Sequence, residues 1–415
     1  MLARQLYFLL KVRKQQWLNP DDLRRLQEEK LRAMIRHAFK YSPYYRRLWK
    51  SRGIDPEGIR TVDDLEKLPV LTKCEVVRHY NQFISLKYRE LYRIGNVVVK
   101  STSGSSGAPF RMIFDERAWD YLDAVYLRAL MAAGYDPRKP LAYYWYEQFE
   151  RKGHNRLGFM NKDYIPCTLS EEEQIAMLKK LNPKYVYYFS SILHSLSKRM
   201  SREGVNIDSK MVVTHAEVAT KGMKKSVENA FGVRPLDQYG MNEFNRIAWE
   251  CPEEAGYHVD ADSLALEVLD QKGEMGRAVI TGLTNFTLPL IRYDTGDTVS
   301  TLEDTCPCGR SLPLIKGVEG RTTKLIHLKS GRIITPRALI DAMVRIPAVQ
   351  NFKAVYKGRN RFRIEVAAFD EGDRTIKTVE NRLSRLAGEP IAARIKFVDV
   401  IRTETRGKTN LVSVA

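Results

Sequence analysis

The stretch that decides the fold is residues 171–231, where helix-forming and strand-forming segments alternate. EEEQIAMLKKL (171–181) has helical periodicity, and so do residues 192–203 and 219–231. Between them lie two short apolar runs, YVYYF (185–189) and MVVTH (211–215), which are rich in β-branched and aromatic residues. Alternation of this kind predicts a layered α/β body built on a largely parallel sheet.

The segments on either side of this stretch extend the same body. Residues 94–100 (IGNVVVK) predict a buried strand, and MIF at 112–114 predicts the next strand. Residues 116–133 have the pattern of a helix. Residues 263–299 are rich in strand formers and are punctuated by glycines, which indicates an antiparallel annex.

The last quarter of the chain has a different character. From Thr322 it predicts a small α+β module, made of a strand pair near residues 324–335, helices at 336–344 and 373–387, and strands at 351–357, 361–368 and 394–400. A chain of 415 residues is too long for one compact core. We therefore predict a large α/β domain over residues 1–321 and a small α+β domain over residues 322–415.

The formal charge of +18 is concentrated at the two ends of the chain. Residues 1–60 hold 15 Lys and Arg against 6 Asp and Glu, and residues 322–415 hold 19 against 9. The middle is neutral, because it keeps 34 of the 68 basic and 35 of the 50 acidic residues. Such ends attract an anionic partner: a phosphate-rich cosubstrate, an acidic carrier protein, an anionic membrane or nucleic acid. A merely solvated basic surface is the alternative.

The N-terminus carries a short apolar run, Leu6 to Leu10, which is followed at once by basic residues. No small-residue cleavage site follows, so a signal peptide is disfavoured. The run predicts a helix that packs on a neighbouring element, and contact with a membrane surface is the less favoured alternative. Five cysteines are few, which favours the reducing cytoplasm, with membrane association left open.

A Gly/Ser-rich loop, STSGSSGAP at residues 101–109, lies between the two predicted strands. Glycines let the backbone fold tightly, so that successive N–H groups form a nest for an anion, and the hydroxyls add donors. The loop lacks the Gly-Lys-Ser/Thr ending of a Walker motif, and a flexible surface turn is the alternative. The candidate phosphate ligands are Ser101, Thr102, Ser103, Gly104, Ser105, Ser106 and Gly107.

A candidate zinc-binding pattern consists of Cys251, His258, Cys306 and Cys308, which are spaced as C-x₆-H and, downstream, C-x-C. Three thiolates and one imidazole suit a tetrahedral Zn²⁺ ion. A closed set of four ligands predicts a structural clamp with no open position for chemistry. Reduced cysteines beside an unrelated histidine are the alternative, since spacing this loose is less diagnostic than paired C-x₂-C.

Three further motifs follow the Gly/Ser loop in order: Tyr-Gly-Met-Asn-Glu at 239–243, Arg-Tyr-Asp-Thr-Gly-Asp at 292–297, and Arg-Thr-Glu-Thr-Arg-Gly-Lys at 402–408. Together they resemble the adenylate-forming enzyme superfamily. Phe110 replaces the lysine that many members carry after the loop, and the phenylacetate–coenzyme A ligase branch, with its capsule-biosynthesis relatives, commonly lacks that lysine too. The resemblance covers nearly the whole chain.

The resemblance implies a nucleotide site. The Gly/Ser loop would close over the phosphates of ATP. Tyr239, followed by Gly240, would stack its ring on adenine, and Glu243 would hold Mg²⁺, a hard cation that prefers oxygen ligands. Asp297 would grip both ribose hydroxyls, because a carboxylate can accept two hydrogen bonds from a diol. Arg321 would reach the nucleotide as well.

The resemblance also implies a catalytic lysine. Lys408 would bridge the substrate carboxylate and the α-phosphate, where a fixed ammonium stabilises developing charge. Ala216 and Glu217 would line the adenine and acyl pockets, although the usual glycine of that segment is missing. The small domain would be mobile about a hinge, where Thr323 and Lys324 stand in place of two acidic residues. Some members of the branch carry a structural zinc in the region of the cysteines.

The implied activity is ATP-dependent conversion of a carboxylic acid to an acyl-adenylate, followed by transfer to a thiol, in the first place coenzyme A. A phosphopantetheine on an acyl carrier protein, an amine or a hydroxyl are alternative acceptors. A different class of function is a non-catalytic basic binding protein on a decayed ligase fold. The altered hinge supports that class, and retention of Glu243, Asp297 and Lys408 argues against it. No nucleic acid is expected as partner, and a homodimer is left open.

Overall fold

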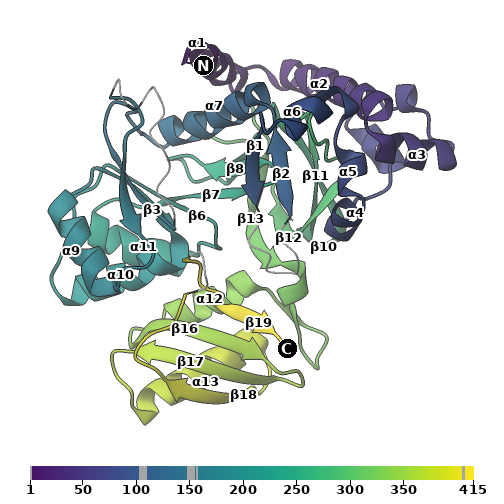
Figure 1. Ribbon diagram of the computed structural model, residues 1–415. Coiled ribbons are helices and arrows are strands. Elements are labelled where there is room, and N and C mark those ends of the chain that lie inside the picture. The colour runs from purple at the N-terminus through teal and green to yellow at the C-terminus, as the bar shows by residue number, and fades with distance from the viewer. Residues whose placement is uncertain (1, 102–109, 147–154, 156–157, 404–406) are drawn as a thin grey trace. The chain divides into compact units, whose positions relative to one another are not determined.

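The computed structural model describes residues 2–101, 110–146, 155, 158–403 and 407–415. The chain forms two compact units that interleave along the sequence (Figure 1). The first unit comprises Met1–Ala132 and Tyr239–Gly317, and the second comprises Ala133–Gln238 and Val318–Ala415. Among the residues that the structure describes, none of the helices combines the length and the apolar character that crossing a membrane requires.

The first unit holds an antiparallel sheet and most of the N-terminal helices. The sheet order is β10-β11-β12-β13-β9-β8-β7, and each pair with a defined register is antiparallel. A separate hairpin joins β1 to β2. The elements are α1 (Leu2–Gln15), α2 (Pro20–Tyr41), α3 (Pro43–Ser51), α4 (Lys73–Arg78), α5 (Tyr80–Phe83), α6 (Arg89–Arg93), β1 (Val98–Ser101), β2 (Arg111–Phe114), α7 (Glu116–Ala132), β8 (Asn245–Glu250), β9 (Tyr257–Val259), β10 (Leu264–Lys272), β11 (Met275–Gly282), β12 (Tyr293–Thr301) and β13 (Leu314–Arg321).

The second unit contains the parallel α/β layers that residues 171–231 predict. Its strands have the order β7-β6-β5-β3-β4, all parallel, and β7 crosses into the first unit. The elements are β3 (Leu141–Trp145), β4 (Lys162–Pro166), α9 (Glu171–Leu181), β5 (Tyr185–Phe189), α10 (Ser190–Arg202), β6 (Met211–His215), α11 (Lys221–Phe231) and β7 (Leu236–Met241). The α/β fold class is thereby confirmed.

The C-terminal part of the second unit is a four-stranded sheet of order β18-β17-β16-β19 with two helices. The elements are β14 (Ile326–His327), β15 (Ile333–Ile334), α12 (Pro336–Val344), β16 (Val349–Tyr356), β17 (Arg361–Ala368), α13 (Asp373–Ala387), β18 (Ala392–Phe397) and β19 (Val412–Val414). Its buried core includes Phe352, Ile364 and Leu383, and Met223 of α11 belongs to the same cluster. The domain boundary after Arg321 stays a prediction, because residues 318–415 group with 133–238 in one unit.

The predicted strand at residues 94–100 needs a correction. The strand β1 begins only at Val98, and Val99 is 48% exposed, so the segment is not a buried strand. Its partner β2 is the buried member of the hairpin, with Met112, Ile113 and Phe114 all inside. A two-stranded hairpin needs to bury only one strand, which is why a run of β-branched residues does not suffice to predict burial.

Candidate active site

The predicted adenine-stacking residue and the predicted ribose-binding residue are hydrogen-bonded to each other in the first unit. The hydroxyl of Tyr239, near the end of β7, donates to Oδ2 of Asp297 in β12 at 2.7 Å. Both side chains are buried. An aromatic face beside a carboxylate is the combination that a purine and its ribose diol require.

The local backbone of β12 holds Asp297 in place. Gly296 adopts a positive φ of 71°, and the Asp297 N–H donates to the hydroxyl of Thr295 at 3.1 Å. That hydroxyl in turn donates to the carbonyl oxygen of Ala278 on the neighbouring strand at 2.8 Å. Arg292, at the start of the same motif, has a structural role instead, since it binds the Glu267 carboxylate at 2.8 Å.

The predicted magnesium ligand, Glu243, follows β7 and is buried. Its Oε1 accepts a hydrogen bond from the hydroxyl of Tyr293 at 3.2 Å. The turn that carries Glu243 depends on Gly240, because a Cβ there would lie 2.3 Å from the carbonyl oxygen of Asn245. No side chain tolerates such a contact, so the glycine of this motif is required by the fold as well as by any ligand.

The start of the Gly/Ser loop lies beside the same turn. The side-chain amide of Asn242 donates to the carbonyl oxygen of Ser101 at 2.7 Å, which gives Asn242 a defined contact. The remaining predicted phosphate ligands lie outside the described residues: Thr102, Ser103, Gly104, Ser105, Ser106 and Gly107.

The predicted catalytic lysine lies in the second unit, in a segment that we call the lysine loop, residues 407–410. The backbone N–H of Thr409 donates to Oε1 of Glu217 at 2.6 Å. Oε2 of Glu217 accepts from the backbone N–H of Ser191 at 2.9 Å and from the Ser191 hydroxyl at 2.6 Å. Burial raises the pKa of Glu217, and the bonds from Ser191 and Thr409 and the charge of Lys408 oppose that shift. Glu217 is therefore a half-buried carboxylate that holds the lysine loop.

Two further features fix the lysine loop. Lys324, in the predicted hinge, donates a hydrogen bond from Nζ to Oδ1 of Asn410. Gly407 has a positive φ of 72°, and a Cβ there would lie 2.6 Å from Cβ of Cys167. The residue before Lys408 therefore has to be glycine.

The predicted pocket residue Ala216 has a φ of 67°. The segment that carries Ala216 and Glu217 therefore keeps a left-handed conformation without a glycine, which costs about 1–2 kcal/mol.

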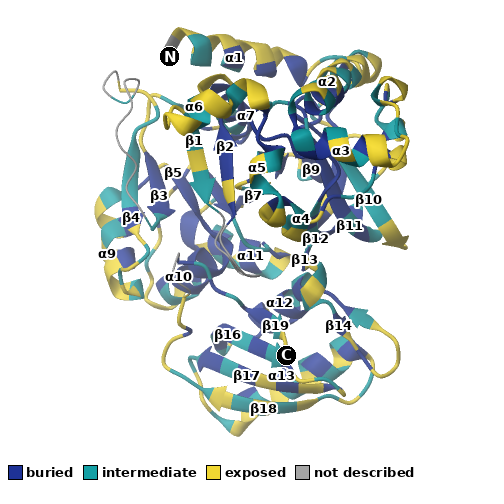
Figure 2. Cartoon of the chain, turned by 45° about the vertical axis from the view of Figure 1, so that its right-hand side comes forward, coloured by how far each residue is buried: buried dark blue, intermediate teal, exposed yellow. Residues whose placement is uncertain are grey.

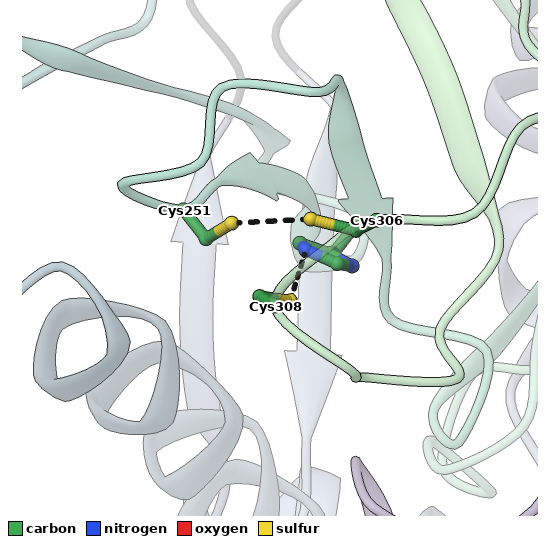
Figure 3. A group of neighbouring side chains, drawn as sticks. Cys251, Cys306 and Cys308 are labelled. Carbon is green, nitrogen blue, oxygen red and sulfur yellow. Dashed lines mark hydrogen bonds between the residues drawn. The ribbon is translucent and has the colours of Figure 1, made fainter.

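The four predicted zinc ligands lie together in the first unit. The ligand atoms of Cys251, His258, Cys306 and Cys308 all lie within 4.8 Å of one another. Cys251 Sγ is 3.5 Å from Cys306 Sγ, and Cys308 Sγ is 3.4 Å from Nε2 of His258. The three labelled sulfur atoms converge on a common centre (Figure 3). A disulfide would need an S–S distance of about 2 Å, so all three thiols are free.

These distances fit a tetrahedral metal site. With Zn–S bonds of about 2.3 Å and Zn–N bonds of about 2.0 Å, neighbouring ligand atoms would lie about 3.5–3.8 Å apart. Burial raises the pKa of the Cys251 thiol to about 12 and lowers the pKa of the His258 imidazole to about 4. His258 is therefore neutral at pH 7, the form in which imidazole binds metals. A cation would stabilise the thiolates that burial alone disfavours.

Sequence reasoning missed the residues that position the predicted ones. Ser191 and Thr409 hold Glu217 and the lysine loop, and Tyr293 bonds Glu243. The sequence does contain a signal for Tyr293, because this residue lies inside the Arg-Tyr-Asp-Thr-Gly-Asp motif. Nothing in the sequence connects Thr409 with Glu217, which lies 192 positions earlier. Of the predicted nucleotide contacts, Arg321 lies at the end of β13 and its side chain is exposed.

Curated relatives cover most of the chain, although no family model matches it. The phenylacetate-coenzyme A ligase of Thermus thermophilus is 28% identical over 350 residues, which are 79% of this chain and 77% of that protein. The Escherichia coli phenylacetate-coenzyme A ligase is 26% identical over 78% of this chain and 77% of its own length. Protein CapK of Staphylococcus aureus is 22% identical over 76% and 71%. The chain is a distant relative of the phenylacetate–coenzyme A ligases.

Solved structures show that the fold is that of the adenylate-forming ligases. The 2-hydroxyisobutyryl-CoA ligase in complex with R3-HIB-AMP has a TM-score of 0.78 and 17% identity, covering 94% of this chain and 89% of that one. The anthranilate CoA ligase AuaEII in complex with anthranoyl-AMP has a TM-score of 0.58 and 14% identity, covering 76% and 66%. The chain thus combines this fold with the Tyr239–Asp297 pair and the other groups described above.

Proposed function

We propose that this chain is an AMP-forming acid–thiol ligase. In the first step a carboxylate oxygen attacks the α-phosphate of ATP, forms acyl-AMP and expels pyrophosphate. In the second step the thiol of coenzyme A attacks the acyl carbon, forms a thioester, and releases AMP and a proton. The observation that supports the proposal is the hydrogen bond between Tyr239 and Asp297, which places an aromatic ring beside a carboxylate in a relative of the phenylacetate-coenzyme A ligases.

The first unit supplies the groups for the nucleotide. The Tyr239 ring would support adenine and the Asp297 carboxylate would bind the ribose diol. Glu243 would hold Mg²⁺, which would neutralise charge on the phosphates. Glu243 suits Mg²⁺ because it is a buried carboxylate, and the hydrogen bond from the Tyr293 hydroxyl to its Oε1 holds it in position.

The second unit supplies the cation for the first step. The ammonium of Lys408 would stabilise charge that builds on the transferring phosphoryl group and the attacking carboxylate. Glu217 serves this step indirectly, because its bond to the Thr409 N–H fixes the backbone next to Lys408. We further propose that the domain formed by residues 322–415 moves between the two steps, as the resemblance implies.

A carrier protein is the second candidate acceptor, and one observation fits it as well as it fits coenzyme A. Along the strands of the C-terminal sheet, every second residue lies on the face opposite the buried core. This outer face carries five basic side chains and a single acid, Glu365, which pairs with Arg363 at 3.3 Å. The basic residues are Lys353, Arg361, Arg363, Arg394 and Lys396. Such a face would attract an acidic carrier or the phosphates of coenzyme A. A homodimer stays a prediction.

We also propose a structural Zn²⁺ ion at Cys251, His258, Cys306 and Cys308, on the distances given above. The ion would tie the β8–β9 hairpin to the segment between β12 and β13. Its thiolates require a reducing compartment, which agrees with the predicted cytoplasmic location.

The experiment that tests the proposal supplies ATP, Mg²⁺ and coenzyme A with a panel of aryl and aliphatic acids. Mass spectrometry would detect the acyl-coenzyme A and equimolar AMP. Acid-dependent AMP without a thioester would contradict coenzyme A as acceptor, and the same assay with phosphopantetheinylated carrier protein would then test the alternative. Neither AMP nor thioester with any acid would contradict a ligase for these acids.

A further inference from the structure

The first helix has an outer face of large apolar side chains. Leu6, Tyr7 and Leu10 in α1 are 54%, 58% and 52% exposed, and Trp17, just after the helix, is 52% exposed. Four of the most exposed large apolar residues in the described chain therefore fall within twelve positions. Figure 2 shows exposed residues recurring along α1 at the top of the view. We call Leu6, Tyr7, Leu10 and Trp17 the apolar ridge.

The opposite face of α1 is anchored, so the apolar ridge cannot turn inward. Phe8 and Val12 are buried in a cluster with Tyr121 and Val125 of α7. Arg4 binds Asp120 of α7 at 2.6 Å, and Gln5 donates to the same carboxylate at 3.0 Å. The packing predicted for the N-terminal helix is confirmed for this face. The apolar ridge is left in water, and covering it with another apolar surface would remove the free-energy cost of that exposure.

Basic side chains flank the apolar ridge, and the acidic side chains that contact α1, Glu116 and Asp120 of α7, pair with Arg4. Residues 2–17 contain Arg4, Lys11, Arg13 and Lys14 and no Asp or Glu. Lys11, Arg13 and Lys14 are exposed, and the structure shows no ion pair to any of them among the residues it describes. By helical spacing, Arg13 follows Leu6 and Leu10 on one side of the ridge, and Lys14 follows Tyr7 and Leu10 on the other.

We propose that the outer face of α1 binds the surface of an anionic lipid bilayer, with the helix lying in the plane of the headgroups. Leucine, tyrosine and tryptophan side chains would enter the boundary of the acyl chains, and Lys11, Arg13 and Lys14 would meet lipid phosphates. Tyr and Trp are the aromatic residues that favour this interface.

Charge decides against the two simplest other occupants. A second copy placed symmetrically on the same face would bring two sets of Lys11, Arg13 and Lys14 into one interface, and α1 offers no acidic side chain to pair with them, so like-charge repulsion disfavours this occupant. A purely polar anion, such as nucleic acid, would satisfy the cations but would leave Leu6 and Leu10 in water. A bilayer with anionic headgroups satisfies both sets of groups, and binding through one short helix is expected to be reversible.

The test is flotation of the full chain with vesicles of phosphatidylcholine, with and without phosphatidylglycerol. We expect binding to the anionic vesicles, weaker binding to the neutral ones, and weakening by salt. Leu6→Glu/Leu10→Glu and Arg13→Glu/Lys14→Glu should each reduce binding by about tenfold or more. The matched controls are Ile94→Glu, which changes another exposed apolar residue, and Lys357→Glu/Arg359→Glu, which reverses two exposed charges in the second unit.

Several results would overturn the proposal. Failure to float with anionic vesicles would do so, and so would equal binding by the α1 variants and their controls. Binding that is equal for neutral and anionic vesicles would remove the role of the cations. Self-association without lipid that is lost in Leu6→Glu/Leu10→Glu would assign the ridge to a second copy. Thermal unfolding of each variant, which should match the wild type, separates these outcomes from misfolding.

Discussion

At the scale of single residues, the lysine loop depends on one half-buried carboxylate. Glu217 joins α10 to the residue after Lys408, through Ser191 on one oxygen and Thr409 on the other. Hydrogen bonds to a charged group contribute about 1.5–3 kcal/mol each, and a buried N–H without an acceptor carries a penalty of similar size. We therefore propose that Glu217 acts on the chemistry through the position of Lys408.

Glu217→Gln tests this positioning role. An amide offers one acceptor oxygen, so either the Ser191 or the Thr409 N–H would face an NH₂ group. We expect acyl-AMP formation to slow by about tenfold or more while ATP affinity is unchanged, because the nucleotide groups of the first unit are untouched. Steady-state kinetics would show the loss in kcat. Glu371→Gln, an exposed carboxylate of the second unit, is the control. Equal kcat values for both variants would contradict the role.

Much of the candidate site could be predicted from the sequence, but its supports could not. Tyr239, Glu243 and Asp297 stand in compact motifs whose residue types match their chemistry. The Thr409–Glu217 bond joins positions that only the folded chain brings together. Likewise, the buried pair of Arg128 and Asp260, at 2.5 Å, has no local signature, since a buried charge and a solvated one look the same in a sequence.

At the scale of elements, the boundaries that the sequence predicts well are those with local stop signals. Helix α9 begins after Ser170, which forms a capping box with Glu173, and ends at Asn182 in a left-handed conformation. Both signals act within a few residues, so residues 171–181 are read correctly from the sequence. The predicted burial of β1 is wrong, because burial depends on which strand of the hairpin faces the core.

The cysteine cluster joins three elements, and this makes its contribution to stability testable. A metal present at 100 times its Kd stabilises the folded state by about 2.7 kcal/mol. We expect Cys306→Ser to lose most bound zinc and to lower the free energy of unfolding by about that amount. Metal analysis should find one zinc per wild-type chain. Cys74→Ser, at an exposed free cysteine, should change neither quantity. A wild type without zinc, or a Cys306→Ser variant of full stability, would contradict the site.

Helix α10 is joined to the C-terminal module by a half-buried lysine. Lys198 donates from Nζ to the carbonyl oxygens of Ile346, at 2.9 Å, and Val349. Burial lowers the pKa of Lys198 to about 8. Since the ordinary value is higher, the unfolded chain binds more protons than the folded chain between about pH 8 and pH 10.4.

This difference in proton binding sets the direction in which the free energy of unfolding changes with pH. The stability of the wild type relative to Lys198→Met should rise with pH across this window, by about 1–3 kcal/mol, and should be flat below it. Thermal unfolding of both proteins over the alkaline range would measure this. Other groups that titrate there, such as Lys30, are common to both proteins and cancel. A difference that falls or stays constant as pH rises would contradict the burial of this charge.

At the scale of the whole molecule, we propose that residues of both units take part in one reaction. The residues proposed to bind the nucleotide belong to the first unit, and Lys408 and Glu217 belong to the second. The rival, a basic binding protein on a decayed fold, also explains the excess charge at the ends of the chain. It does not explain why the Tyr239–Asp297 pair and the Glu217 tether are both intact.

The most direct measurement is carboxylate-dependent exchange of label between pyrophosphate and ATP, for wild type and Lys408→Ala. The exchange isolates the first step and needs no acceptor, so it is independent of the identity of the thiol. We predict exchange that requires an acid and falls by about 10²–10³-fold in the variant. Exchange that is unaffected in Lys408→Ala, or a wild type that neither binds ATP nor exchanges with any acid, would contradict the account.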